Sequence, residues 1–132
     1  MSCAFCELPA ERIVFQNELA IAFYDGYPVS EGHALVIPKR HVADYWGLTA
    51  AEREACHNLL DTLRQSILQK DPLVTGFNIG LNAGASAGQT VFHCHFHLIP
   101  RRDGDVPNPR GGVRHVIPGK GHYKSSDPPK KV

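Results

Sequence analysis

The segment "HCHFHLIPRR", residues 93–102, places histidines at every second position. Successive side chains of a β-strand point to opposite faces, so this spacing predicts a strand that carries His93, His95 and His97 on one face. The residue after each histidine is apolar, and we expect these three residues to enter the core from the opposite face: Cys94, Phe96 and Leu98. The segment therefore predicts a sheet with a row of imidazoles along one face.

Composition narrows the class of protein. The 132 residues are 42% hydrophobic and 20% charged, which is typical of a globular domain. Fourteen basic residues nearly balance thirteen acidic ones, which argues against a dedicated nucleic-acid or membrane surface. The first fifteen residues lack the pattern of a signal peptide, so we expect a cytoplasmic protein whose cysteines stay reduced.

The pattern along the chain predicts an α+β fold. Residues 11–25 resemble two short strands around a turn, and residues 34–37 a third strand. Thr49 and Glu52 form a capping-box sequence that opens a long helix ending at Asp71. Residues 76–82 alternate as a further strand. We expect an antiparallel sheet with one helix packed on it, in a domain of residues 1–102 followed by an extended Pro- and Gly-rich tail at 103–132.

Three histidines on one face permit two kinds of chemistry. Imidazoles can hold a catalytic metal ion, or a neutral imidazole can attack phosphorus as a nucleophile. A histidine-rich strand without chemistry is the third reading. The preceding loop, "NAGASAGQT" at residues 82–90, favours a phosphate ligand, because glycines expose backbone N–H groups and three side chains add donors: Asn82, Gln89 and Thr90.

The sequence resembles a known family in these same segments. "HCHFHLI" matches the His-φ-His-φ-His-φ-φ signature of the histidine triad (HIT) nucleotide hydrolases and transferases, and "GQTVFHCHFHLIPR", "AFYD", "GHALVIPKRH" and "CAFC" extend the match over residues 3–102. The tail "NPRGGVRHVIPGKGHY" is similar to that of bacterial HIT hydrolases. The resemblance implies a five-stranded antiparallel sheet with one long helix, and a homodimer.

The resemblance also implies roles for individual residues. His95 matches the nucleophile, and His97 matches the residue that binds the phosphate and manages the proton of the leaving group. Gln89 and Thr90 match residues near the phosphate and the leaving group. Asn82 matches an asparagine that donates to the phosphate.

Three further matches concern the nucleoside and the orientation of the nucleophile. Asp25 matches an acidic residue that accepts from the ribose hydroxyls. Phe23 matches one wall of the pocket for the base. His33 matches a residue whose backbone carbonyl orients the nucleophile, so His95 would donate to that carbonyl.

The spacing of Cys3 and Cys6, C-x-x-C, indicates a redox pair or half of a metal site. Relatives with this start hold a structural zinc, which by position would here be bound by Cys3, Cys6, His41 and His93. No catalytic cofactor is expected, although a divalent cation could accompany the substrate.

The function implied by the resemblance is hydrolysis of a purine nucleotide derivative at the α-phosphorus, through nucleotidyl-His95. The third histidine favours a hydrolase over the transferase branch. Dinucleoside polyphosphates such as diadenosine tetraphosphate are the preferred substrates, and adenosine phosphoramidates are the alternative. A nucleotide-binding regulatory module without catalysis is the reading from a different class.

Overall fold

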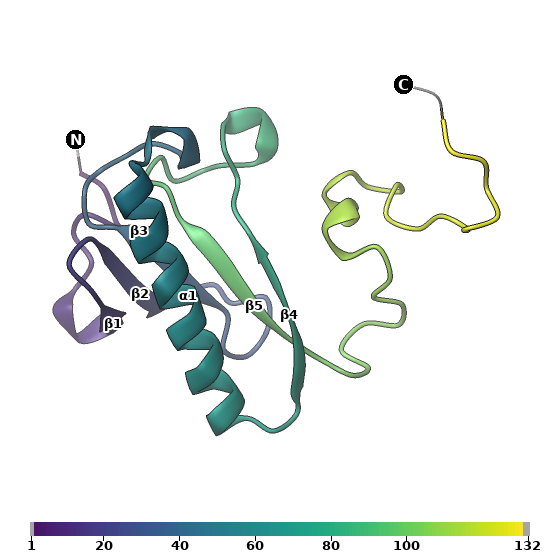
Figure 1. Ribbon diagram of the computed structural model, residues 1–132, viewed down its shortest axis with the longest axis horizontal. Coiled ribbons are helices and arrows are strands. Elements are labelled where there is room, and N and C mark those ends of the chain that lie inside the picture. The colour runs from purple at the N-terminus through teal and green to yellow at the C-terminus, as the bar shows by residue number, and fades with distance from the viewer. Residues whose placement is uncertain (1, 131–132) are drawn as a thin grey trace. The chain divides into compact units, whose positions relative to one another are not determined.

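The computed structural model describes residues 2–130, and its centre is one antiparallel sheet of five strands (Figure 1). The spatial order of the strands is β1-β2-β3-β5-β4. Their bounds are β1 Ile13–Gln16, β2 Ala20–Tyr24, β3 Ala34–Pro38, β4 Val74–Gly80 and β5 Phe96–Arg102. The predicted α+β class, with its five-stranded antiparallel sheet and one long helix, is confirmed.

Within residues 2–130 there is one α-helix, α1, which runs from Ala50 to Lys70. Thr49 precedes it, and the predicted capping box is present: the Thr49 hydroxyl accepts from the Glu52 amide at 3.1 Å, while the Glu52 carboxylate accepts from the Thr49 amide at 2.9 Å. Four short 3-10 segments complete the described elements: η1 Ala10–Arg12, η2 Tyr45–Gly47, η3 Ala85–Ala87 and η4 Gly112–Val116.

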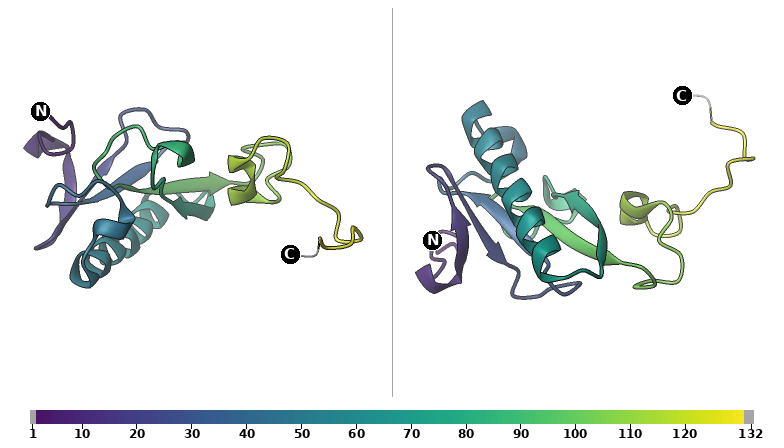
Figure 2. Two further views of the ribbon diagram at one scale, coloured as in Figure 1. Left: turned by 90° about the horizontal axis from the view of Figure 1, so that it is seen from above. Right: turned by 60° about the horizontal axis from the view of Figure 1, so that its bottom comes forward.

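Helix α1 covers one face of the sheet, as the two views in Figure 2 show. Its apolar residues recur at helical spacing and are buried against the strands: Cys56, Leu59, Leu60, Leu63 and Ile67. The alternation of the histidine segment is also confirmed, because the strand side of this core includes Cys94, Phe96 and Leu98. The histidines are therefore directed away from the helix.

A second, smaller apolar cluster forms apart from the helix-facing core. Phe23, Leu35 and Ile37 are buried in it, and Phe5 and Leu8 of the N-terminal segment pack against them. These strand residues alternate with members of the helix-facing core, so they lie on the opposite face of the sheet. The N-terminal segment thus takes the place that a second helix would have in a three-layer fold.

The histidine strand is shorter than predicted. Strand β5 begins at Phe96, so His97 lies on it, whereas His93, in a bend, and His95 precede the strand. The reason is a competing partner, because the Cys94 amide donates to the Val42 carbonyl at 2.7 Å rather than to a neighbouring strand. The first two histidines are thereby placed beside the loop that follows β3.

The chain divides into two compact units, Met1–Arg102 and Asp103–Val132. Within the second unit, described to residue 130, the backbone of Gly111 approaches that of Gly121 so closely that a Cβ on Gly111 would lie 2.1 Å from the Gly121 oxygen. Gly111 also has a φ of 92°, a conformation that favours glycine. Among residues 2–130, no helix has both the length and the apolar composition needed to cross a membrane.

Candidate active site and metal centre

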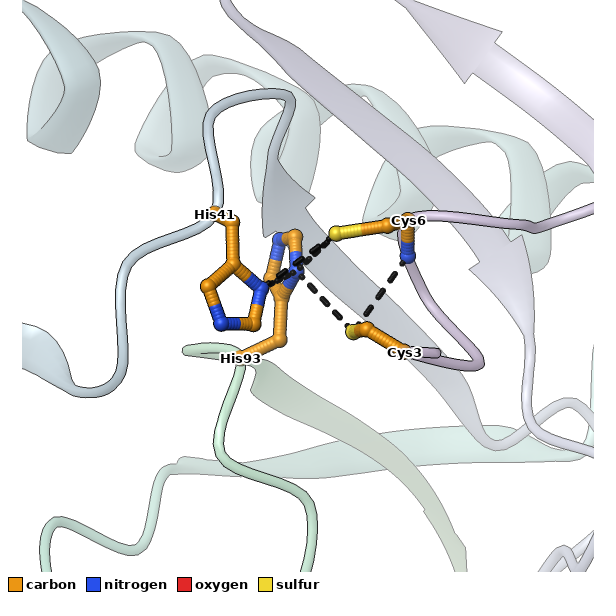
Figure 3. Close-up of side chains that lie close together, drawn as sticks. All are labelled: Cys3, Cys6, His41 and His93. Atoms are coloured by element: carbon orange, nitrogen blue, oxygen red, sulfur yellow. Dashed lines mark hydrogen bonds between the residues drawn. The ribbon is translucent and has the colours of Figure 1, made fainter. Parts of the chain in front are cut away.

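Four side chains from three separate segments converge on one point (Figure 3). Cys3 and Cys6 come from the N-terminal turn, His41 from the loop after β3, and His93 from the segment before β5. Their potential ligand atoms all lie within 4.8 Å of one another, so the cluster could hold a metal ion.

The distances within the cluster match a tetrahedral zinc site. The two Nδ1 atoms of His41 and His93 are 3.3 Å apart, the Cys6 sulfur lies 3.3 and 3.5 Å from them, and the Cys3 sulfur lies 3.6 Å from that of His93. Bond lengths of about 2.0 Å to nitrogen and about 2.3 Å to sulfur, at tetrahedral angles, require about 3.3 Å between two nitrogens and about 3.5 Å between nitrogen and sulfur. The donor set and its spacing therefore fit zinc.

The tautomer of His93 also fits a metal ligand. Its ring is fully buried, and Nε2 donates to the Pro38 carbonyl at 2.8 Å. In a neutral imidazole the other nitrogen then carries the lone pair, so Nδ1 presents it to the two cysteines and His41. Burial lowers the pKa of His93, which keeps the ring neutral at pH 7.

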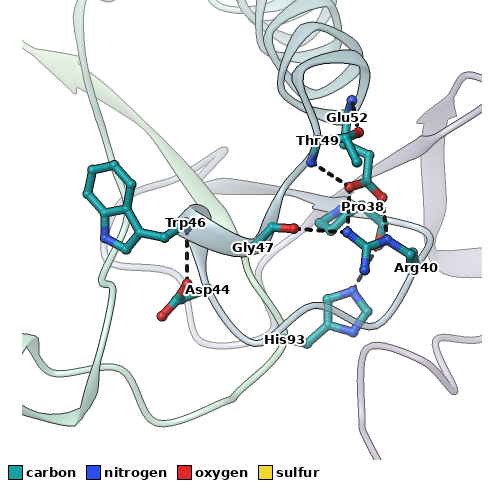
Figure 4. A network of polar contacts seen from close by, with 8 residues as sticks. All are labelled: Pro38, Arg40, Asp44, Trp46, Gly47, Thr49, Glu52 and His93. Carbon is teal, nitrogen blue, oxygen red and sulfur yellow. Dashed lines mark hydrogen bonds and ion pairs between the residues drawn. The ribbon is translucent and has the colours of Figure 1, made fainter.

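An ion pair between the buried Glu52 and the exposed Arg40 supports the loop that carries His41 (Figure 4). Arg40 donates to both oxygens of the Glu52 carboxylate, at 2.8 and 3.0 Å, and to the Gly47 carbonyl at 2.9 Å. The bond from Arg40 lowers the pKa of Glu52 to about 2, although burial opposes it. Glu52 thus links the start of α1 to Arg40, the residue next to His41. The sequence predicted only its part in the capping box.

His95 is buried, with 8% of its surface exposed, and the backbone of His93 orients its ring. Its Nδ1 donates to the carbonyl oxygen of His93 at 2.8 Å. Because one nitrogen of a neutral imidazole must be the acceptor, Nε2 carries the lone pair. This is the protonation state that a nucleophile needs.

The predicted role of the His33 backbone is wrong. The His33 carbonyl accepts the Asp25 amide at 2.9 Å, at the end of the pairing between β2 and β3, and the structure gives the orienting bond to the His93 carbonyl instead. The side chain of His33, rather than its backbone, contacts the triad, and the sequence did not predict this contact. Its Nδ1 accepts from the Val29 amide at 3.1 Å, so its Nε2 carries the proton and donates to Nδ1 of His97 at 2.9 Å.

The bond from His33 fixes the tautomer of His97. Since Nδ1 of His97 accepts, Nε2 is the N–H donor of the ring. Burial, followed by the neighbouring histidines His95 and His33, lowers the pKa of His97 to about 4. His97 is therefore neutral at pH 7 and offers a hydrogen bond rather than a mobile proton.

Asp25, His33 and His97 form a second group of possible metal ligands, with ligand atoms within 4.8 Å of one another. The hydrogen bonds argue against a metal there. The Val29 amide already occupies the lone pair of His33 Nδ1, so Nε2 of His33 must keep its proton and cannot bind an ion. Asp25 instead accepts the Tyr27 amide at 2.8 Å and lies 3.5 Å from Nε2 of His33.

Gln89, predicted to lie near the phosphate and the leaving group, uses its side-chain amide to bind the backbone of the neighbouring loops. Its side chain is buried and donates to the carbonyls of Ala43 and Val91, while its oxygen accepts the Gly84 amide at 2.9 Å. All these partners are backbone atoms, so the amide holds the glycine-rich loop in shape. Of the other loop donors, Thr90 is exposed and Asn82 half-buried.

Phe23 is only 1% exposed, so its ring has little surface left for a nucleobase. Phe5 packs against it with ring centroids 5.5 Å apart, and the Arg12 guanidinium lies 5.3 Å from its ring centre while donating to the Tyr24 carbonyl at 2.7 Å. The sequence did not lead us to predict that Phe5 and Arg12 pack against Phe23. Phe5 could have been predicted to lie near the site, because it stands between the two cysteines in the sequence.

Known proteins share both the sequence and the fold. The HIT domain model matches residues 7–104. An uncharacterised HIT-like protein of Mycoplasma genitalium is 39% identical over 104 residues, which cover 76% of this chain and 73% of that protein. A Zn-bound histidine triad family protein from Mycobacterium smegmatis superimposes with a TM-score of 0.72 at 35% identity, over 80% of this chain and 78% of the other.

A third similar structure is a hypothetical histidine triad nucleotide-binding protein from Sulfolobus tokodaii. It has a TM-score of 0.71 and 34% identity, over 80% of this chain and 73% of the other. The matched family model spans more than half of the chain and includes all three histidines of the triad. The chain therefore belongs to the HIT domain family.

Proposed function

We propose that the protein hydrolyses nucleotidyl substrates at the α-phosphorus through a nucleotidyl-His95 intermediate. The observation that carries the proposal is the hydrogen bond that His95 Nδ1–H donates to the His93 carbonyl. In the neutral ring this bond leaves the lone pair on Nε2, and the ring of His97 lies 5.2 Å away between centroids. A buried, oriented, neutral imidazole is suited to attack phosphorus without a separate base.

The first step forms a bond between His95 Nε2 and phosphorus and breaks the bond from phosphorus to the leaving group, which departs with its electron pair. His95 becomes a cationic phosphorylated imidazole, and the His93 carbonyl stabilises its Nδ1–H. Water then attacks phosphorus, the N–P bond breaks, and the proton from water is released with the nucleoside monophosphate. His95 returns to its neutral form.

His97 would donate a hydrogen bond from Nε2 to the phosphoryl oxygens. Each such preorganised donor contributes roughly 2.7 to 4 kcal/mol by analogy with oxyanion donors. Asn82 and Thr90 are the further side-chain donors we assign to the phosphate. We assign Asp25 to the ribose hydroxyls, because its carboxylate is partly exposed and directly follows β2.

The pKa of His97 bears on the leaving group. A histidine with a pKa of about 4 is a weak source of protons at pH 7. A departing polyphosphate does not need a proton, since phosphate groups of this kind have a pKa of about 6 and leave as anions. A departing amine does need a proton. We therefore propose dinucleoside polyphosphates, such as diadenosine tetraphosphate, as the substrates, with adenosine phosphoramidates as the alternative.

We also propose that Cys3, Cys6, His41 and His93 hold a structural zinc, by analogy with the Zn-bound relative and on the distances given above. When bound, the ion would cross-link the N-terminal turn to the loop after β3 and supply no catalytic group. Gln89 would then act on the phosphate indirectly, through the shape of the loop. A homodimer and a cytoplasmic location remain predictions.

The test compares kcat/KM on diadenosine polyphosphates and on AMP-lysine, for the wild-type protein, His95→Ala and His57→Ala. His57 is an exposed histidine on α1 and serves as the matched control. We expect turnover of the polyphosphate in the wild type and the control, with loss in His95→Ala. Binding of AMP without turnover of either substrate would instead favour a nucleotide-binding module.

A further inference from the structure

The ring of Phe5 contacts both the metal cluster and the triad. It packs edge-on against His95, with centroids 5.1 Å apart and planes at 77°, and against His93 at 6.0 Å and 75°. It also contacts Phe23 at 5.5 Å and 66°. Among the described residues, Phe5 therefore has three ring partners, and two of them are triad histidines.

The position of Phe5 depends on the turn that the two cysteines form. The Glu7 amide donates to the Cys3 carbonyl at 3.0 Å, and the Cys6 amide lies 3.5 Å from the Cys3 sulfur. Phe5 lies inside this turn, one residue before Cys6. A metal bound by both sulfurs would fix the turn at two points, and so fix the side chain between them.

His95 has one directional restraint and two contacts that limit the rotation of its ring. The hydrogen bond from Nδ1 to the His93 carbonyl is the directional one. The rings of Phe5 and His97 lie at 5.1 and 5.2 Å. A single hydrogen bond to a carbonyl tolerates a broad range of angles, so packing must supply the remaining precision.

We propose that Phe5 is a positioning residue for His95, and that it transmits the order of the metal-bound turn to the nucleophile. This rests on the proposed function only for the identity of the reaction, because the contact between the rings is independent of it. The metal centre then acts on His95 by two routes, through the His93 carbonyl and through the Phe5 ring. Neither route requires the metal to touch substrate.

The variants that test the proposal are Phe5→Ala, Phe5→Leu and Phe5→Tyr, with Leu8→Ala as the control. Leu8 belongs to the same segment and the same apolar cluster, but no ring contact joins it to His95. For the zinc-loaded protein and diadenosine tetraphosphate, we expect Phe5→Ala to lower kcat at least tenfold and to change KM less than threefold. Phe5→Leu should be intermediate, Phe5→Tyr close to wild type, and Leu8→Ala within twofold of wild type.

Two measurements without turnover complete the test. Metal analysis should find the same zinc content in all five proteins, and NMR of the His95 ring nitrogens should show one sharp tautomer in the wild type, Phe5→Tyr and Leu8→Ala, and a broadened one in Phe5→Ala. The NMR result stands even if the wild type hydrolyses no nucleotide, so failure of the proposed function would be distinguishable. Equal loss of kcat in Phe5→Ala and Leu8→Ala, or an unchanged His95 spectrum in Phe5→Ala, would overturn the proposal.

Discussion

The carbonyl oxygen of His93 accepts the Nδ1–H of His95 at 2.8 Å, while the imidazole of the same His93 presents its own Nδ1 to Cys3, Cys6 and His41. One residue thus joins the candidate metal centre to the candidate nucleophile through two different groups. The three histidines are equivalent in the sequence but not in the structure, because each has a different partner for the nitrogen that decides its tautomer: the Pro38 carbonyl, the His93 carbonyl and the His33 ring.

Replacement of the nucleophile should abolish turnover. His95→Ala removes the group that bonds to phosphorus, and we expect kcat/KM to fall by roughly 10³ or more, as for other covalent catalysts. Alkaline-quench trapping with labelled nucleotide, which preserves the acid-labile N–P bond, should detect a nucleotidyl-enzyme in the wild type and none in the variant. Residual activity within tenfold of wild type would rule out His95 as the nucleophile.

The metal cluster should bind about one zinc per chain. Cys6→Ser and Cys3→Ser each remove a thiolate, so we expect zinc content well below one equivalent and a lower Tm, because binding energy at a structural site is folding energy. Metal analysis and thermal melts measure both effects, with His57→Ala as the control. If chelation stops turnover at once and leaves the fold intact, the metal takes part in catalysis and the purely structural role is incorrect.

The buried histidines should make stability depend on pH. The pKa of His97 is about 4 in the folded protein and about 6.5 when unfolded, so the unfolded state binds more protons between these values. The stability that His97 contributes is therefore fully present above about pH 6.5 and is lost as the pH falls towards 4. Burial lowers the pKa of His33 and His93 as well, which adds to the same trend.

Thermal melts at intervals from pH 7.5 to 4 measure this dependence. We expect Tm to decrease across that range, and the decrease to be smaller in His97→Gln, which keeps polar groups at the position but does not titrate. Since zinc release at low pH would have the same direction, the melts should be repeated on Cys3→Ser, which lacks the thiolate. A pH dependence equal in His97→Gln and its parent would contradict the assignment to His97.

The Arg40–Glu52 pair should support both the helix and the metal loop. Glu52→Gln keeps the size of the side chain but removes its charge, and the carboxylate is 5% exposed, so we expect a loss of about 1 to 3 kcal/mol in the free energy of unfolding at pH 7. Urea denaturation measures it. Glu54→Gln, a change at a neighbouring exposed position of α1, should have little effect. Equal stability of the two variants would show that the ion pair is unimportant.

Gln89 should act through the loop rather than on the substrate. Gln89→Leu leaves the Gly84 amide and the Ala43 carbonyl without their partner. Since Gly84 is half-buried and Ala43 exposed, water can replace part of each bond, and each loss costs about 0.5 to 1.5 kcal/mol. We expect a lower Tm and a higher KM, with a smaller change in kcat. A large fall in kcat at unchanged Tm would instead indicate direct contact with the reacting groups.

The sequence alone determined the fold class and the helix. Three local patterns could be recognised without the structure: the capping box, the helical spacing of the core residues, and the alternation of Cys94, Phe96 and Leu98. The C-x-x-C turn could also be recognised as a source of metal ligands, since cysteine and histidine side chains carry ligand atoms wherever they lie.

Only the tertiary structure decided how the histidines differ. The tautomer of an imidazole depends on partners distant in the chain, such as the Val29 amide for His33 or the Pro38 carbonyl for His93, and no local pattern encodes these contacts. The same holds for the start of β5 at Phe96, which the competing bond from the Cys94 amide to the Val42 carbonyl sets. The sequence therefore determined which groups are present, and the packing of the strands and loops decided which nitrogen of each ring carries its proton.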